Sequence, residues 1–567
     1  MDNEKQSVII GSPRATAQVW LPDNLILAGP IGTPLEAYFR AFGLIDERLI
    51  VAGIINGEIR ELTYRITSDS EVEPVTLHSS DGMRIYRRSL SLLLVAAAHE
   101  LFPEAQVYVD HSLPFGGYFC TVDGRPNFQP EELAEIEARM REIVASDDAI
   151  TKERLPLTDA TALYQERGDL GKVRLLEHRR KPYLVMYRLR QTSGYFHGYM
   201  VPSTRYLRWF ALRHYPPGFV IQFPQKEAPT GPLEYMDHPR LAAVFREYRR
   251  WLQLMDVQDV AALNDAILSG RIQEVVLVAE ALHEGRIAAI AQEIARQKQI
   301  KLVLIAGPSS SGKTTFSKRL AIQLLAAGVR PFTMAMDNYF LNRADTPRDH
   351  MGDYDFESLE ALDLKLFNQH LVQLMDGKEI GLPVYNFQTG RRETGRQARL
   401  LPDQVILAEG IHGLNPALVP YVPSQSIMRI YVSALTQLNL DQHNRVPTTD
   451  TRLIRRIVRD ATHRGYNAAD TIARWEKVRH GEKSYIFPYQ EHADVMFNSA
   501  LVYDLAALKP LAEPLLLQIE PGTRERVEAK RLLALLRWFE PCPARLVPDN
   551  SILREFIGRS ILHEFEP

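Results

Sequence analysis

The hydrophobic pattern of the first 230 residues predicts a mixture of short strands and helices. An apolar, β-branched run at 49–55 leads into Asn56-Gly57, a dipeptide typical of the turn between two antiparallel strands. Helical patterns follow at 88–102 and 131–145, and strand-like runs at 181–189 and 218–223. Such a mixture is typical of α+β domains.

The pattern changes twice in the second half of the chain. Residues 235–299 have no proline after Pro239 and are rich in Ala, Leu, Glu and Arg, so we interpret them as a helical connector. Residues 301–306 are almost wholly apolar, as expected for a strand buried on both faces of a parallel sheet. Helical and strand-like runs then alternate to about 510, which predicts a doubly wound α/β domain. The tail is helical at first and then rich in proline.

These changes divide the chain into five predicted segments, since 567 residues are too many for a single core. Two α+β segments precede the connector, and the α/β segment and the tail follow it. Their bounds are 1–70, 71–230, 231–299, 300–510 and 511–567.

The composition is that of a globular protein, with 45% hydrophobic and 24% charged residues. A formal net charge of −3 argues against binding nucleic acid through overall charge, although a local basic patch stays open. The two cysteines, Cys120 and Cys542, give no disulfide framework or metal cluster. We find no signal-peptide pattern at 1–5, and the most apolar stretch, 90–98, is too short to span a membrane. We therefore expect a cytoplasmic protein.

A complete phosphate-binding motif follows the strand predicted at 301–306. Residues 307–314 read GPSSSGKT and satisfy G-x-x-x-x-G-K-[ST]. The glycines let backbone N–H groups curl around a phosphate, and the helix expected next presents its positive N-terminal end. Lys313 can reach the β- and γ-phosphates, and the Thr314 hydroxyl can bind Mg²⁺. We predict that ATP is bound by Gly307, Pro308, Ser309, Ser310, Ser311, Gly312, Lys313, Thr314 and Thr315.

Two further strand-like runs end in carboxylates. The run at 331–336 leads to Asp337, and the run at 405–408 leads to Glu409. Beside the P-loop, Asp337 suits a base that takes a proton from an acceptor hydroxyl, and Glu409 suits an acid of the metal shell. Taken alone, each acid is more easily explained as a solvated residue at a strand end. Together with the P-loop they favour a kinase over a molecular switch, because a switch needs no base aimed at a hydroxyl.

Arginines recur on the helix predicted after these strands. Arg452, Arg455, Arg456 and Arg459 are three or four residues apart, and Arg464-Gly465 follows. Phosphoryl transfer needs cations over the charge of its transition state, and a lid that carries arginines supplies them. The alternative is a solvated basic helix. We predict that Arg456 and Arg459 are catalytic, together with Lys313 and Asp337.

With these motifs in this order, residues 301–510 resemble the uridine kinase and phosphoribulokinase branch of P-loop kinases. The likeness is carried by DNYF at 337–340, DFE at 355–357, PVYNF at 383–387, EGI at 409–411 and the lid arginines. The resemblance implies ATP as donor, Asp337 as catalytic base, and Thr314, Asp337 and Glu409 around Mg²⁺. It also implies substrate contacts near a ribose and base, which we assign to Tyr339, Glu357, Tyr385, Phe387, Arg452 and Arg474.

The resemblance weakens where the identity of a base would be read. Uridine kinases carry a histidine three residues after the aromatic that closes their Tyr-Asp-aromatic segment, and this chain has Gly390 there. A glutamine of the family's lid aligns with Arg474, which precedes Trp475 in place of a tyrosine. We expect a nucleoside 5′-hydroxyl as acceptor, with another sugar or polyol as the alternative.

Residues 1–225 resemble the two N-terminal domains of threonyl-tRNA synthetase. The segment INGEIREL at 55–62 resembles a TGS domain, and AHELFP at 98–103, GGYF at 116–119 and VPST at 201–204 resemble the editing domain. Segments 1–70 and 71–230 are therefore predicted to be TGS-like and editing-like.

The editing chemistry of that family uses a His-x-x-x-His pair and a Cys-x-x-x-His pair. Our alignment places Arg88 and Leu92, then Phe196 and Met200, at those positions. None of the four can do the same proton or metal chemistry. We predict an inactive editing-like domain that binds or regulates, in which His99, His111 and His197 are structural.

The order TGS-like, editing-like and kinase resembles that of long bacterial proteins called uridine kinase or nucleoside kinase. This implies a phosphotransferase that uses ATP and Mg²⁺ on a small molecule, and we expect a homo-oligomer without a membrane partner. We also expect the two halves to fold separately, so that a chain starting near Ser269 stays soluble. The alternative from another class is a nucleotide-driven protein that binds tRNA or the ribosome through the TGS-like domain.

Overall fold

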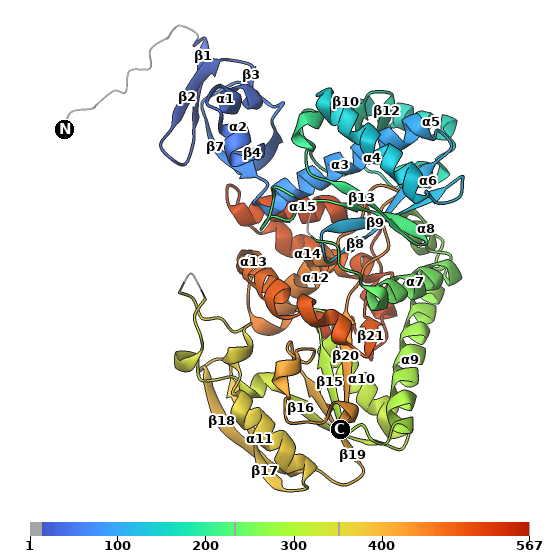
Figure 1. Cartoon of the computed structure of the whole chain (residues 1–567), viewed down its shortest axis with the longest axis vertical. Coiled ribbons are helices and arrows are strands. Elements are labelled where there is room, and N and C mark those ends of the chain that lie inside the picture. Colours follow the sequence, from blue (N-terminus) through green and yellow to red (C-terminus); the bar gives the residue numbers. More distant parts are fainter. Residues whose placement is uncertain (1–13, 232–233, 350–351, 566–567) are drawn as a thin grey trace, which may run out of the picture.

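The computed structural model of the chain describes residues 14–231, 234–349 and 352–565. Residues 1–13, which include the start of the predicted first domain and the segment without a signal-peptide pattern, lie outside this description. Figure 1 shows an elongated molecule with the first domain at one end and a large parallel sheet toward the other. Within the described part, none of the helices combines the length and apolar character that a membrane crossing needs.

The first domain contains a five-stranded sheet in the order β2-β1-β7-β4-β5. Strands β4 (Ile50–Ile55) and β5 (Glu58–Glu61) pair antiparallel across Asn56 and Gly57, whose φ angles are 50° and 74°. Positive φ at both central residues is the geometry that favours Asn-Gly, so the predicted hairpin is confirmed. The other elements are β1 (Thr16–Trp20), β2 (Ile26–Pro30), β3 (Thr33–Pro34), α1 (Leu35–Ala41), α2 (Leu44–Arg48), β6 (Arg65–Ile66) and β7 (Ser70–Thr76).

The second domain packs a four-stranded sheet, β13-β14-β9-β8, and a three-stranded sheet, β10-β11-β12, around the long helix α3 (Ser80–Leu101). This helix starts eight residues before the predicted one, because the Ser79 side chain caps it by accepting a hydrogen bond from the Gly82 N–H at 3.0 Å. The other predicted helix and strands are present as α4 (Pro130–Ala145), β11 (Tyr183–Leu189) and β14 (Gly218–Gln222). Further elements are β8 (Gln106–Leu113), β9 (Gly117–Asp123), β10 (Thr151–Pro156), α5 (Leu157–Glu166), α6 (Leu170–Glu177), β12 (Thr192–Tyr195) and β13 (Ala211–Tyr215).

The predicted connector forms three helices, α7 (Pro239–Leu254), α8 (Val260–Leu268) and α9 (Ile272–Arg296). They do not link two separate bodies. Tyr248, Val260 and Val275 are buried in one hydrophobic core that also takes in Tyr164 of the second domain and strands of the parallel sheet. The core is therefore continuous between the two halves, in contrast to the separate folding expected from the sequence.

The C-terminal domain is α/β and doubly wound, as predicted. Its five strands are all parallel, in the order β16-β19-β15-β20-β21. The central strand β15 (Leu302–Ala306) is fully buried, as its apolar sequence predicts. Helices flank the sheet, and α9 runs alongside α10 in Figure 1. The elements are α10 (Lys313–Ala326), β16 (Arg330–Ala335), α11 (Leu364–Met375), β19 (Gln404–Glu409), β20 (Ile427–Ser433), α12 (Thr448–Arg459), α13 (Ala468–Tyr485), β21 (Val495–Asn498) and α14 (Asp504–Leu517), with the hairpin β17 (Glu379–Asn386) and β18 (Arg391–Arg399) at one side.

The tail returns to the parallel sheet and does not extend away from it. Helix α15 (Arg524–Leu536) packs beside α14, and the short helix α16 (Arg554–Ile557) packs beside α12. The Lys318 ammonium on α10 donates hydrogen bonds to the carbonyl oxygens of Leu562 at 2.7 Å and His563 at 2.9 Å. The last residues of the chain are thereby held against the helix that follows the P-loop.

Candidate functional site

The P-loop lies at the carboxyl edge of the parallel sheet, between β15 and α10. Ser310 and Gly312 have positive φ angles, 57° and 84°, which bend the loop back toward the first turn of the helix. A side chain at Gly307 would collide with the Val432 carbonyl oxygen, and one at Gly312 would collide with Ile552. Glycine is needed at both places, and the resulting loop aims backbone N–H groups at a bound anion.

Polar side chains gather at the end of this loop. The Lys313 ammonium donates a hydrogen bond to the Pro308 carbonyl oxygen at 3.3 Å, and the Thr314 hydroxyl donates one to the Glu409 carboxylate at 3.3 Å. Asp337 lies in a 3₁₀ turn, Met336–Tyr339, just after β16 rather than at its last position. Asp337 and Glu409 stand at the ends of the adjacent strands β16 and β19, and Lys313 and Thr314 begin α10. The structure therefore brings together the lysine, hydroxyl and acids that the sequence singled out.

Burial changes the protonation of the acids at this site. It raises the pKa of Asp337 above its usual value, with Lys313 and Arg464 opposing the shift. It raises the pKa of Glu409 to about 7, with Lys313 again opposing. It also raises the pKa of Glu357 to about 7, where the Glu482 carboxylate adds to the effect. A group of acids with pKa values displaced toward neutrality is typical of a functional site.

The site fits Mg²⁺ in the manner of phosphate-binding enzymes. Among the described residues, no group of three or more His, Cys, Asp or Glu side chains could hold a metal ion. Mg²⁺ usually binds one or two carboxylates and completes its shell with water and substrate phosphates. Glu409 and the Thr314 hydroxyl already touch, and Asp337 raises the pKa of Glu409, as expected of two acids that share a site. Thr314, Asp337 and Glu409 therefore stay our prediction for the metal site.

Helix α12 lies beneath the P-loop and carries the predicted lid arginines. The Arg456 guanidinium donates a hydrogen bond to the Ser309 hydroxyl at 2.6 Å. Arg452 is 1% exposed, donates to the Ser309 carbonyl oxygen at 2.9 Å and pairs with Glu482. Arg452 thus positions the loop from below, which differs from the substrate contact predicted for it. Arg459 pairs with Asp460 at 2.8 Å.

The remaining predicted substrate residues fall into two groups. Glu357, beside Asp337 and Lys313, faces helix α13, where a side chain at Gly481 would collide with it. Tyr385 and Phe387 form a T-shaped pair with ring centroids 5.1 Å apart, and Phe387 is 61% exposed. Tyr339 is buried with its hydroxyl 3.1 Å from His370, so it supports the site from inside the core. Arg474 is exposed and stacks on Tyr466 at 4.4 Å.

Arg343 lies beside Gly390 and Phe387, and the sequence did not indicate it. Gly390 has a φ of 68°, and a side chain there would collide with the Arg343 guanidinium. The Arg343 guanidinium also donates a hydrogen bond to the Phe387 carbonyl oxygen at 2.8 Å. The space that a histidine would take in a uridine kinase is therefore occupied by an arginine from 47 positions earlier in the chain, and no local pattern reveals this.

Glu555 in the tail is the second residue that sequence reasoning missed. Its carboxylate accepts a hydrogen bond from the Thr315 N–H at 3.1 Å, at the start of α10. It also contributes to the raised pKa of Glu409. The motif around it, Asn550 to Gly558, carries no recognisable chemistry, so only the folded tail shows that an acid reaches the P-loop helix.

The residues aligned with the editing chemistry lie in a hydrophobic core. Leu92, Phe196 and Met200 are buried, and Arg88 is partly exposed at the wall of a cavity. Burial and nearby arginines lower the pKa of His197 to about 3, so its ring is neutral and stays hydrogen-bonded to the Tyr195 hydroxyl at 2.9 Å. These positions supply no group that could activate a water.

Known proteins are similar to this chain in two regions, the P-loop domain and the N-terminal domains. Residues 302–506 match the family model described as Phosphoribulokinase / Uridine kinase family. This region is thus similar to P-loop kinases of that type. Among solved structures, the chain is similar to a possible uridine kinase from Bacillus stearothermophilus (20% identity, TM-score 0.25, covering 35% of this chain and 89% of the other). It is also similar to the phosphoribulokinase from Rhodobacter spheroides (21% identity, TM-score 0.25, covering 35% and 70%).

A second similarity concerns a different part of the chain. The chain is 34% identical over 197 residues to a threonine–tRNA ligase from Acidovorax sp. (strain JS42), which is 34% of this chain and 30% of the relative. The chain thus spans about a third of the length of the curated relatives it matches. The N-terminal domains are consistent with this similarity.

Proposed function

We propose that this chain is a kinase that transfers the γ-phosphoryl group of ATP to a hydroxyl group of a small molecule, preferably the 5′-hydroxyl of a nucleoside. The observation that carries the proposal is the meeting of Lys313, Asp337 and the Thr314–Glu409 pair at the end of one P-loop. A base next to a phosphate-binding lysine is what phosphoryl transfer to an alcohol requires.

The residues act as follows in this proposal. Backbone N–H groups of the loop and the Lys313 ammonium hold the phosphates. Arg456 fixes the loop through Ser309 and, with Arg459, adds positive charge over the transferred group. Thr314, Asp337 and Glu409 would hold Mg²⁺, which would neutralise charge on the phosphates. Asp337 takes the proton as the acceptor oxygen bonds to the γ-phosphorus and the bond to the β-phosphate oxygen breaks, leaving ADP.

Acceptor choice rests on residues beyond the P-loop. Tyr385 and Phe387 offer aromatic surface to a base, and Glu357 offers a carboxyl group to ribose hydroxyls. Arg343, in place of the uridine kinase histidine, favours the second candidate, a kinase of another sugar or polyol. Arginine has donors and no acceptor, so it suits the hydroxyl oxygens of a polyol but cannot accept from the ring N–H of a uracil edge, as a histidine nitrogen can.

The test is ADP formation by the full chain with ATP and Mg²⁺ over nucleosides, sugars, polyols and tRNA. We expect turnover with one class of small acceptor, lost by at least about a thousandfold in Lys313→Ala. Asp337→Asn should bind ATP normally and lower kcat by about a hundredfold or more. Asp345→Asn, an exposed acid eight residues on, is the control. Turnover only with tRNA, or an unchanged kcat in Asp337→Asn, would refute the proposal.

A further inference from the structure

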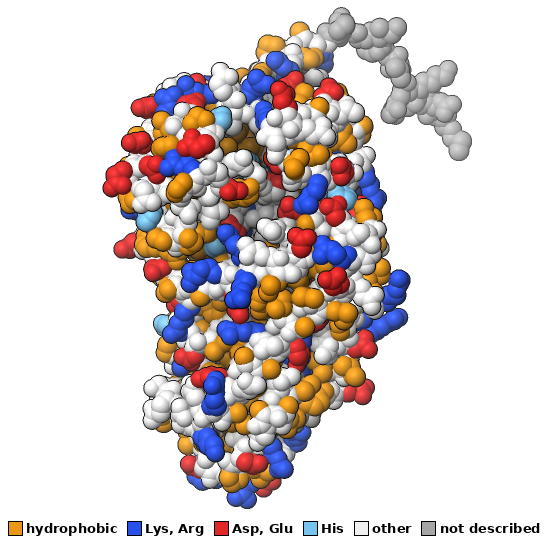
Figure 2. Space-filling view, turned by 90° about the vertical axis from the view of Figure 1, so that its right-hand side faces the viewer, with side chains coloured by type: hydrophobic (Ala, Val, Ile, Leu, Met, Phe, Trp, Pro, Cys, Tyr) orange, Lys and Arg blue, Asp and Glu red, His pale blue; other side chains and the backbone are white. Residues whose placement is uncertain are grey.

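A cavity of about 930 Å³ lies away from the P-loop, between the two N-terminal domains and helix α15. Its wall combines α3, the strands β11 and β12 with the loops beside them, the segment 443–450 that leads into α12, and α15. Figure 2 shows that the molecule is hollowed in its upper half, where the N-terminal domains lie. A volume of this size accommodates a ligand as large as a nucleotide.

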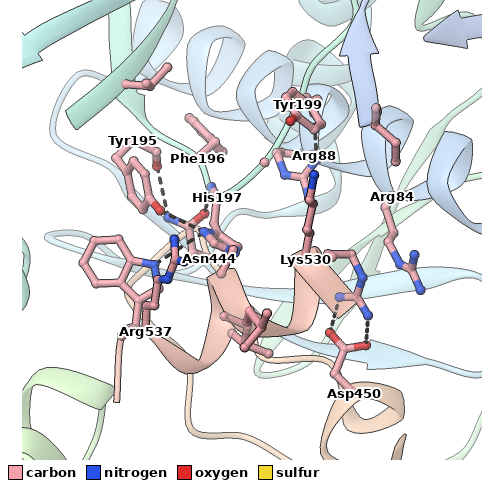
Figure 3. A pocket seen from close by; sticks show the side chains of 18 of the residues that line it. Arg84, Arg88, Tyr195, Phe196, His197, Tyr199, Asn444, Asp450, Lys530 and Arg537 are labelled. Carbon is pink, nitrogen blue, oxygen red and sulfur yellow. Dashed lines mark hydrogen bonds and ion pairs between the residues drawn. The ribbon is translucent and has the colours of Figure 1, made fainter. Parts of the chain in front are cut away.

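The wall of the cavity is strongly basic. Lysine and arginine side chains outnumber carboxylates on it by eleven to four among the described residues. Each of the four carboxylates already pairs with a cation, as Asp450 does with Arg531 at 2.5 Å. Figure 3 shows Lys530 reaching from α15 toward Arg88 on the opposite side. Lys152 and Arg180 pair with Glu61 and Glu540 outside the wall. Among the described residues, the basic side chains of the wall without an ion pair are Arg88, Arg179, Lys181, Arg445 and Arg537.

Three of these arginines are fixed by neutral groups. Arg88 donates a hydrogen bond to the Tyr199 carbonyl oxygen at 2.7 Å, Arg179 to that of Tyr183 at 2.8 Å, and Arg445 to that of Asp110 at 3.2 Å. No described carboxylate lies within ion-pair distance of any of the three. Burial lowers the pKa of each guanidinium. A carbonyl oxygen orients a guanidinium and leaves its charge free for an anion, and arginine matches the geometry of phosphate.

Aromatic rings line the same space. Arg179 stacks on Trp538 at 4.9 Å, and Arg445 on Tyr118 at 4.7 Å. Tyr183 and the exposed Tyr199 also line the cavity. Rings beside cations suit a ligand that carries both a planar group and phosphate. Arg88, Leu92, Phe196 and Met200, the positions aligned with the editing chemistry, offer a cation and apolar surface and no proton acceptor.

We propose that this space, called the anion cavity below, binds a phosphorylated small molecule with a planar ring, of the nucleotide class, at a site separate from the P-loop. Arg88, Arg179 and Arg445 bind the phosphate, and the tyrosines and Trp538 border the ring. The site does not depend on which acceptor the kinase domain phosphorylates.

The cavity is also joined to the P-loop through one helix. Arg531 on its wall pairs with Asp450 in the first turn of α12, and the same helix carries Arg452 and Arg456 to Ser309 of the P-loop. A ligand that draws Arg531 toward its phosphate competes with Asp450 for that guanidinium. Ligand binding in the anion cavity would therefore shift the position of α12 relative to the P-loop.

The experiment is photolabelling of the full chain with 8-azido-ATP and 8-azido-AMP, followed by peptide mapping. We expect labelled peptides from the cavity wall as well as from the P-loop domain, with pyrophosphate competing at the cavity. Arg88→Met and Arg445→Met should each lower cavity labelling about tenfold or more. The control is Arg180→Met, which removes a 77% exposed side chain at the rim that is paired with Glu540.

P-loop labelling and the melting temperature report whether each variant is folded. Cavity labelling lost in both arginine variants, with P-loop labelling kept, supports the site. Absence of label in the wall peptides at saturating probe overturns it. Equal loss in Arg180→Met would mean non-specific attraction and also overturns it. Protection of the wall by tRNA without labelling by either nucleotide would assign the cavity to RNA instead.

Discussion

The P-loop and the anion cavity both present positive charge to an anion, and they hold it with different partners. At the P-loop, Lys313 lies among the carboxyl groups of Asp337, Glu409 and Glu357, and it opposes the rise in pKa that burial causes in each of them. In the cavity, Arg88, Arg179 and Arg445 are held by backbone carbonyl oxygens. One site mixes cations with acids, and the other has cations that no acid neutralises.

This difference separates a site built for reaction from one built for binding. Phosphoryl transfer needs a group that accepts a proton and oxygen atoms that hold a metal ion, so acids must stand beside the cations despite the cost of burying them. Binding a phosphate needs only donors and charge. The cavity wall carries Arg88 where our alignment expects an editing histidine, and an arginine can bind an anion but cannot take a proton.

The cavity and the P-loop lie in domains that share one hydrophobic core. Removing part of this core should have the largest effect on stability. A chain of residues 269–567 lacks Tyr248, Met255, Val257, Val260 and Leu263, all buried against the parallel sheet. Deleting several fully buried side chains costs more than the whole stability of a typical domain. We expect this chain to aggregate, whereas 237–567, which keeps α7 to α9, should be more soluble. Sedimentation and circular dichroism would compare them, and a cooperatively folded 269–567 would show that the halves are independent.

A partly buried network of ion pairs connects the regions, and the pH dependence of its contribution to stability should be the second largest effect. Glu528 on α15 lies between Arg84 of α3 and Arg531, which in turn pairs with Asp450 of α12. These arginines outweigh desolvation and lower the pKa of Glu528 to about 2. A folded pKa below the unfolded value of about 4.3 stabilises the protein above that pH. The stabilisation is lost as the pH falls from about 4.3 toward 2.

Glu528→Gln should therefore lower the free energy of unfolding at pH 7 by up to about 3 kcal/mol. Its difference from the natural chain should shrink as the pH approaches 2. Chemical denaturation at several pH values measures both effects, with Glu525→Gln one turn earlier on the same helix as the control. Two separate unfolding transitions in the natural chain, only one of them sensitive to Glu528, would show that the network does not couple the regions.

The sequence predicted what depends on neighbouring residues and missed what depends on distant ones. The strand at 301–306, the P-loop and the hairpin at Asn56-Gly57 are local patterns, and the structure contains all three. Arg343 opposite Gly390, and Glu555 on the P-loop helix, are contacts between segments far apart in the chain. A spacing rule cannot find them, because the fold decides which segments meet. For the same reason α7 to α9 were identified as helical, while their place in the core was not.

The smallest expected effect is on the KM for ATP, and it comes from Glu555, an acid of the tail that reaches the P-loop helix. The Glu555 carboxylate accepts a hydrogen bond from the Thr315 N–H, one of the groups predicted to bind phosphate. A nucleotide phosphate and Glu555 would compete for that donor and repel each other. Glu555→Gln keeps the shape and removes the charge, so the KM for ATP should fall about threefold to tenfold with little change in kcat.

Steady-state kinetics at varied ATP measures this effect, and Glu564→Gln, an exposed tail acid, is the control. The substitution should not detach the tail. Ile552 still packs against Gly312, and Lys318 still donates to the Leu562 carbonyl oxygen. A fall in KM would mean that the tail acid opposes nucleotide binding, as an extra carboxylate at a phosphate site must. A higher KM would mean instead that Glu555 orients the loop for the nucleotide. In that case the acids of the P-loop site would aid nucleotide binding as well as reaction. The P-loop site would then no longer differ from the anion cavity in using its acids for reaction alone.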